Sequence, residues 1–284
     1  MNRAAVTAGP ARPDAPLPWW RAAGWIALYA VREMARRRRL AATAAVGAVP
    51  VALVVLWRIL DGGHGIPAPL LLANLGGVLY VHFGVVIAGL AFGLGAVGEP
   101  LDDGTLLYYW TRPVGRGAIY GGRVLAAQAV AALLVLASLV GCFLAFTAGN
   151  WGLLTPTFVL LYLRTCLVVV LGAVVYTALF ALLGTAWRRP LLPALALGFG
   201  WETLGGNTPL RLQRLTVVFH LRNLMDNPAP DTGGMVNLLQ RLQQGLQQAV
   251  PRPSPAASLL ALLAAVAVTL LLGQWLLRRR ELSR

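Results

Sequence analysis

The sequence predicts an all-helical protein with several membrane-spanning helices. Of its 284 residues, 58% are hydrophobic and 12% are charged, whereas soluble domains carry about 25% charged residues. Long apolar runs alternate with polar segments too short to bury a core of their own. Arginines cluster at the edges of apolar runs, at 36–39, 188–189 and 278–280, which is typical of membrane proteins. We therefore expect an all-α polytopic membrane protein. Nucleic-acid binding is the other class that a net charge of +14 indicates.

Six apolar segments predict six membrane spans. They lie at about 40–60, 70–97, 118–148, 157–187, 190–206 and 256–277. A helix of about 20 residues crosses the hydrocarbon layer of a membrane, and five of the segments reach that length. The fifth is too short, because its apolar part, 191–201, extends only about 17 Å as a helix. The distribution of arginines does not decide whether this segment crosses.

The N-terminal residues show two patterns. Residues 1–17 are rich in proline and alanine and predict a disordered tail. Residues 18–39 place apolar and aromatic side chains at helical spacing and end in arginines. This pattern favours a helix that lies in the membrane interface. The alternative is that these residues begin the first span.

Residues 208–225 and 235–250 predict two amphipathic helices between the fifth and sixth spans. The apolar face of the first is marked by Leu210, Leu215, Phe219 and Leu224. The second has a polar face rich in glutamine rather than arginine. A glutamine face suits a helix on the membrane surface away from the anionic cytoplasmic leaflet.

Three polar side chains fall within predicted spans: His82, Arg164 and Glu202. A lone charge inside a membrane is costly, so we hypothesise a salt bridge between Arg164 and Glu202. The alternative is that each side chain reaches the interface independently. His82 has no partner ligands at helical spacing, which favours a hydrogen-bonded packing histidine over a contact with metal or substrate. We expect no metal site.

The sequence contains no recognisable catalytic constellation. It has no His-x-x-x-His, no Gly-x-Ser-x-Gly and no pair of carboxylates within a span. All 24 basic residues are arginine, so a nucleotide-binding P-loop, which requires a lysine, is excluded. We therefore expect that the chain is not an enzyme. If ATP drives its function, another polypeptide binds the ATP.

An acidic segment, Glu99 to Arg116, separates the second and third predicted spans. It holds three of the ten acids of the chain, Glu99, Asp102 and Asp103. The two aspartates predict the start of a helix, with a body from Thr105 to Thr111 and a stop at Pro113. The sequence therefore predicts a short cytoplasmic helix that joins two spans.

This segment resembles that of the permease subunits of ABC-2 type transporters. The matching residues are Glu99, Gly104-Thr105-Leu106, Pro113-Val114, Arg116 and Gly122-Arg123. That family's loop has an acid, Gly-Thr-Leu, a leucine-rich turn, Pro-Val-x-Arg and then Gly-Lys. Here Tyr108-Tyr109-Trp110 replaces the leucine-rich turn, and Arg123 stands where lysine is usual.

The resemblance implies a six-span architecture with both termini in the cytoplasm. It implies that the fifth segment crosses and that 18–39 is the connecting helix of the family. It also implies amphipathic helices on the external side between spans five and six. Such a protein is integral to the inner or plasma membrane of a bacterium.

The resemblance also implies partners. A second permease subunit would complete a homodimer or heterodimer, and two copies of a separate ATPase subunit would bind ATP and Mg²⁺, so this chain binds no cofactor. Contact with the ATPase is implied for Glu99, Asp102, Asp103, Gly104, Thr105, Leu106, Leu107, Tyr108, Tyr109, Trp110, Arg112, Pro113 and Arg116. We expect an exporter of hydrophobic or amphiphilic cargo. The alternative is a membrane-embedded assembly or maturation factor that works with an ATPase without moving a defined solute.

Overall fold

The computed structural model describes residues 18–35, 38–61, 68–104, 115–202, 211–225 and 253–279. Every regular element in these ranges is a helix, so the predicted all-α fold is confirmed for this part of the chain. Five of its helices are long and apolar enough to cross a membrane. They are Leu40–Leu60, Ala68–Leu101, Arg116–Thr147, Pro156–Ala186 and Pro255–Arg279. The chain therefore has the character of a multi-pass helical membrane protein.

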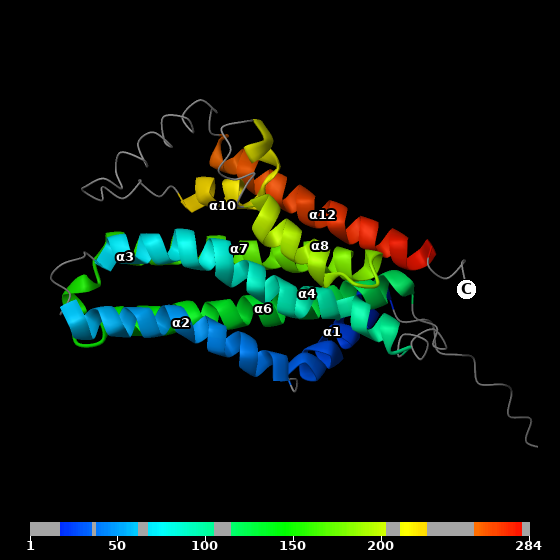
Figure 1. Cartoon of the computed structure of the whole chain (residues 1–284), viewed down its shortest axis with the longest axis horizontal. Helices are drawn as coiled ribbons and strands as arrows, with labels where there is room; N and C mark the ends of the chain where they lie inside the picture. Colours follow the sequence, from blue (N-terminus) through cyan, green and yellow to red (C-terminus); the bar gives the residue numbers. More distant parts are fainter. Residues whose placement is uncertain are drawn as a thin grey trace, which may run out of the picture.

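The long helices lie side by side in a bundle (Figure 1). One continuous rod consists of α3 (Ala68–Asn74), the π-helix η1 (Leu75–Gly84) and α4 (Val85–Asp102). The other long helices are α2 (Arg38–Asp61), α6 (Arg116–Thr147), α7 (Pro156–Ala186) and α12 (Pro255–Arg279). A short turn of helix, η2 (Trp151–Leu153), joins α6 to α7.

The two ends of the bundle gather different parts of the chain. At one end, here called the base, Gly117 near the start of α6 lies beside Gln274 near the end of α12. At the opposite end, called the far end, Arg58 of α2 donates a 2.8 Å hydrogen bond to the carbonyl oxygen of Ala145 in α6. Helices α2, the rod, α6 and α7 therefore run in alternating directions, and α12 runs in the same direction as α7.

The helix predicted over 18–39 is present as α1 (Trp19–Ala35). It lies at the base, beneath the start of α2 and α6 (Figure 1). Its small residues face the bundle, where Gly122 of α6 lets the carbonyl oxygen of Ala23 approach closely. Large aromatic side chains cover the exposed side, namely Trp19, Trp20, Trp25 and Tyr29.

The rod and α7 pack so closely that glycine is required along their seam. A Cβ atom at Gly93 would lie 2.7 Å from the carbonyl oxygen of Thr177, and one at Gly98 would lie 3.0 Å from that of Gly184. At Gly89 a Cβ would lie 2.9 Å from the Cβ of Tyr176. Small residues let the backbones of two helices approach closely within a membrane.

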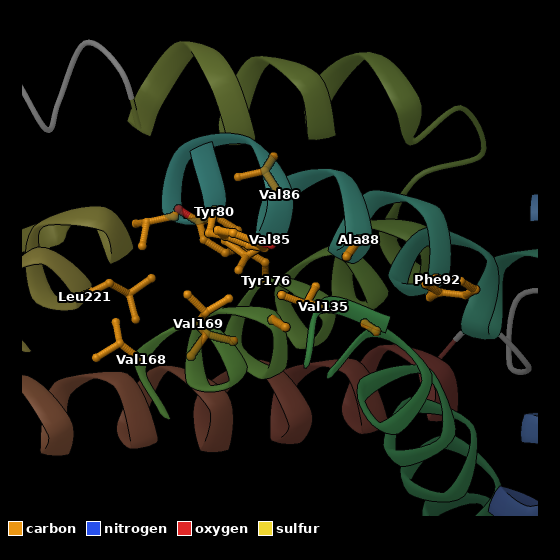
Figure 2. Packing of buried hydrophobic residues seen from close by; sticks show 14 of the residues in the cluster. Tyr80, Val85, Val86, Ala88, Phe92, Val135, Val168, Val169, Tyr176 and Leu221 are labelled. Carbon is orange, nitrogen blue, oxygen red and sulfur yellow. The ribbon is translucent and has the colours of Figure 1, made fainter. Parts of the chain in front are cut away.

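Large buried side chains pack between the rod, α7 and α10 next to this seam. Tyr80 and Val85 from the rod meet Tyr176 from α7, and Leu221 approaches α7 beside Val168 (Figure 2). All five side chains are at most 2% exposed. The core therefore joins elements that are more than a hundred residues apart.

The fifth apolar segment forms two short pieces of helix. These are α8 (Leu191–Leu195) and the π-helix η3 (Ala196–Trp201). Together they form an apolar helix that is shorter than the five candidate spans. It lies across the rod and α7 (Figure 1). The single long span predicted over 190–206 is therefore not found as one long helix in the described residues.

Residues 208–225 were predicted as one helix, and the structure corrects this. It has a short 3-10 helix, η4 (Arg211–Leu215), followed by α10 (Val217–Met225). The helix is interrupted at Thr216, whose hydroxyl donates a 2.8 Å hydrogen bond to the carbonyl oxygen of Gln213. Of the predicted apolar face, Leu215 is 70% exposed, whereas Leu224 packs against the core. The buried side chains are Val217, Val218, Leu221 and Met225. The second predicted amphipathic helix, 235–250, lies outside the described residues.

Helix α10 runs antiparallel to α7 and reaches into the bundle. Leu221 lies against Gly172 of α7, where a Cβ would come within 2.9 Å of its side chain. One turn later, Met225 fills the space above Gly76 of η1. Because Gly172 is near the middle of α7, α10 extends from mid-bundle toward the far end.

The glycine seam predicts a contrast between two single substitutions. Gly93→Ala should destabilise the protein by about 1–3 kcal/mol, because the new methyl group forces α4 away from α7. Gly121→Ala is the matched control, since a Cβ there meets nothing within 4 Å and alanine favours the helix by up to about 1 kcal/mol. Thermal unfolding of the detergent-solubilised protein measures both. Equal melting temperatures for the two variants would contradict the requirement for glycine at Gly93.

Candidate functional site

A buried carboxylate holds the beginning of α10. Glu202, directly after η3, is 3% exposed. Its two carboxylate oxygens accept hydrogen bonds from the backbone N–H groups of Val217 and Val218, both at 3.1 Å. The hydroxyl of Thr216 accepts a longer bond from the N–H of Phe219 (3.4 Å). The first three N–H groups of α10, which have no partner within the helix, are thus satisfied.

An arginine holds the other end of the same helix. The Nε of Arg164 in α7 donates a 2.8 Å hydrogen bond to the carbonyl oxygen of Leu224. A helix carries partial positive charge at its N-terminus and partial negative charge at its C-terminus. Glu202 and Arg164 therefore match the dipole of α10 at its two ends. This arrangement differs from the direct salt bridge that we hypothesised for the pair.

The middle of α10 is attached to η1 by a third polar contact. Nη2 of Arg222 donates a hydrogen bond to Nε2 of His82 (2.8 Å), and Nδ1 of His82 lies 3.2 Å from the carbonyl oxygen of Gly77. The two contacts together require the neutral tautomer with its proton on Nδ1. His82 is thus a hydrogen-bonded partner of α10.

Sequence reasoning identified His82, Arg164 and Glu202 but missed Arg222 and Tyr176. The Tyr176 hydroxyl lies close enough to Glu202 and Arg222 to interact electrostatically with both. The structure brings all five side chains to the surroundings of α10, from four separate elements. His82 and Arg222 are 140 positions apart, and no local pattern relates two positions at that separation.

A second polar site ties three helices together at the base. Arg123 of α6 is 3% exposed, and its Nε donates a 2.6 Å hydrogen bond to the carbonyl oxygen of Ala96 in α4. Its Nη2 lies 3.3 Å from the carboxylate of Glu33 in α1. Glu99 lines a small cavity together with Glu33 and Arg123. We call Arg123, Glu33 and Ala96 the base junction.

The acidic segment is described only at its edges. Glu99 and Asp102 belong to α4, and the N–H of Asp103 bonds to the carbonyl oxygen of Glu99 (2.8 Å). Gly104 follows with φ of 68°, the left-handed conformation that ends many helices. Asp102 and Asp103 therefore end α4, rather than beginning a new helix as predicted. Arg116 is the first residue of α6. The remaining predicted contact residues, Thr105, Leu106, Leu107, Tyr108, Tyr109, Trp110, Arg112 and Pro113, lie outside the described residues.

An apolar groove lies between α2, α4 and α8. It has a volume of about 520 Å³ and is lined chiefly by aliphatic side chains and glycines, including Val46, Leu90, Gly95 and Leu191. Glu99 lies at one end of it. A cavity of this size and composition accommodates a small apolar or amphiphilic molecule.

The arrangement at α10 predicts the result of a charge swap. In the double variant Arg164→Glu with Glu202→Arg, each end of α10 faces a charge of the wrong sign. The loss of stability should therefore be at least as large as that of the more damaging single variant, about 1–3 kcal/mol or more. A direct salt bridge would instead be restored by the double swap. Melting temperatures of the three variants decide between the two arrangements.

The charged side chains described above contact other parts of the same bundle. At α10 and at the base junction they bind helix ends, a backbone carbonyl and the side chains of His82 and Glu33. No group of three or more His, Cys, Asp or Glu side chains in the described ranges is placed to hold a metal ion. No known protein family matches the chain, and neither does any curated protein.

Proposed function

We propose that this chain is the permease subunit of an ATP-driven transporter of the ABC-2 type, acting as an exporter. The observation that carries the proposal is the segment from Glu99 to Arg116, whose residues resemble the coupling helix of that family. A separate ATPase subunit, present in two copies, binds ATP and Mg²⁺ and contacts this segment. A second permease subunit, identical or related, completes the complex.

The base junction supports a role for this segment in transmitting force. Both helices that flank the segment, α4 and α6, are joined through Arg123. The same side chain pairs with Glu33, so α1 is fastened to them as well. Hydrogen bonds that involve a charged group are stronger than neutral ones. A push on the segment therefore reaches α1, α4 and α6 as one unit.

The distribution of arginines supports a cytoplasmic base. Arginines follow or begin the helices at the base, at positions 32, 116, 188, 189, 278 and 279. Cytoplasmic loops of membrane proteins carry an excess of basic residues. In this orientation both termini are cytoplasmic, and the connections at the far end are external.

A broken fifth span supports the proposed count of six. Helices α8 and η3 enter from the base and end at Glu202, and α10 continues toward the far end. Irregular backbone at membrane depth is tolerated where protein surrounds it, and Glu202 satisfies the N–H groups at this break. The segment α8–η3 and the helix α10 together cover the depth of the bundle that one long helix covers elsewhere.

The apolar groove supports a hydrophobic or amphiphilic cargo. It opens between α2, α4 and α8 and offers few polar groups. A sugar or an inorganic ion needs many hydrogen-bonding groups to replace its hydration. We therefore assign the groove to the cargo pathway.

Substitution in the coupling segment should weaken assembly with the ATPase. Large aromatic side chains dominate many protein interfaces, so Tyr109→Ala with Trp110→Ala should lower recovery of the ATPase in a pull-down by about tenfold or more. Trp151→Ala is the matched control, because Trp151 is 74% exposed at the far end. Unchanged recovery and unchanged transport in the double variant would reject the segment as the contact.

Substitution of Arg123 should separate ATP hydrolysis from transport. Arg123→Gln removes the charge that links α1 to α4 and α6, while the coupling segment remains intact. Because such bonds contribute about 1.5–3 kcal/mol, we expect about tenfold slower transport with the ATPase still bound. Cargo movement and ATP hydrolysis are measured in proteoliposomes. Equal loss of both activities would argue against a role in transmission.

A further inference from the structure

The contact between His82 and Arg222 joins two ionisable side chains, whereas Glu202 and Arg164 bind backbone groups at the two ends of the helix. The middle attachment joins a guanidinium to a neutral imidazole. Its strength therefore depends on the protonation state of His82.

Protonation of His82 removes the acceptor that Arg222 uses. Nδ1 already faces the carbonyl oxygen of Gly77 and supplies the proton to it. A second proton can be taken up only at Nε2, which lies 2.8 Å from Nη2 of Arg222. Two N–H donors and two positive charges would then face each other. Rotation of the ring offers no relief, because both nitrogens of a protonated imidazole are donors.

The surroundings leave Arg222 as the charged group that acts on His82. The ionisable side chains of the described elements around η1 are Arg222 and His220 from α10, Tyr162, Arg164, Cys166 and Tyr176 from α7, Glu202 after η3, Tyr80 from η1 itself and Cys142 of α6, which contacts Tyr80. The described ionisable residues of α2 and α4 lie near the ends of those helices, and α3 has none. Of these groups, Arg222 and the carbonyl of Gly77 are the ones that interact directly with His82.

We propose that the His82–Arg222 contact is a proton-operated latch on α10. While His82 is neutral, α10 is held against η1; when His82 is protonated, the middle of α10 is released. The helix stays folded, because Glu202 and Arg164 still bind its ends. His82 is half-buried rather than enclosed within the bundle. The latch concerns the packing of α10 and goes beyond the proposed transport function.

The distance between α10 and η1 tests the latch without any transport assay. Spin labels at Val78→Cys, which is 57% exposed on η1, and Leu215→Cys, which is 70% exposed just before α10, report this distance by pulsed electron paramagnetic resonance. Cys166→Ser removes the less buried native thiol. Labels are attached at neutral pH, and the protein in nanodiscs is then brought to about pH 8 or about pH 3.5, because the neighbouring Arg222 cation opposes a second proton on His82. We expect one distance population at the higher pH and a second, longer one at the lower pH.

His82→Gln is the matched control. Its amide oxygen accepts from Arg222 and does not titrate, so the single population should persist at both pH values. Arg222→Gln is a second variant that removes the opposing cation and should reduce the response to acid. An identical distance distribution for the parent protein at both pH values would overturn the latch. So would an equal response in His82→Gln, which would assign the effect to another titrating group such as Glu202.

Discussion

The contact between α4 and α7 is the constraint on which the bundle depends. Two helices approach within backbone contact only where glycine leaves room, and here the requirement extends from Gly89 through Gly93 to Gly98. Inside a membrane there is no hydrophobic driving force between helices, so close van der Waals packing has to supply the attraction. The seam fixes the axial position of α7 against the rod. That position in turn brings Arg164 and Tyr176 level with α10.

Helix α10 shows how two charged side chains are accommodated at the two ends of one helix. Glu202 and Arg164 each face a helix end whose partial charge has the opposite sign. Removing a charge from water is costly, and the geometry has to compensate through hydrogen bonds. Here the backbone supplies those bonds, so two ionised side chains position a nine-residue helix. An isolated helix of this length is marginal in water, which makes its attachments decisive.

The sequence was informative where a pattern is local and uninformative where a contact is distant. Apolar runs predicted the five long helices to within a few residues. The break at Thr216 was missed, because the apolar periodicity of 208–225 continues across it. Asp102 and Asp103 favour the start of a helix by their charge, but Gly104 adopts a positive φ and α4 ends there instead. The pairing of His82 with Arg222 depends on the fold of the whole chain.

The π-helical stretch in the rod has a consequence for how the rod's two halves are oriented. A π-helix holds more residues per turn than an α-helix, so the passage through Leu75–Gly84 alters the angular register between α3 and α4. This register sets which side of η1 carries His82 toward α10. It also sets which side of α4 carries the glycines toward α7. In a regular α-helix each residue advances the direction by about 100°. Loss of a single residue from this stretch would therefore rotate the glycines of α4 away from α7, although every side chain of the seam remained in the sequence.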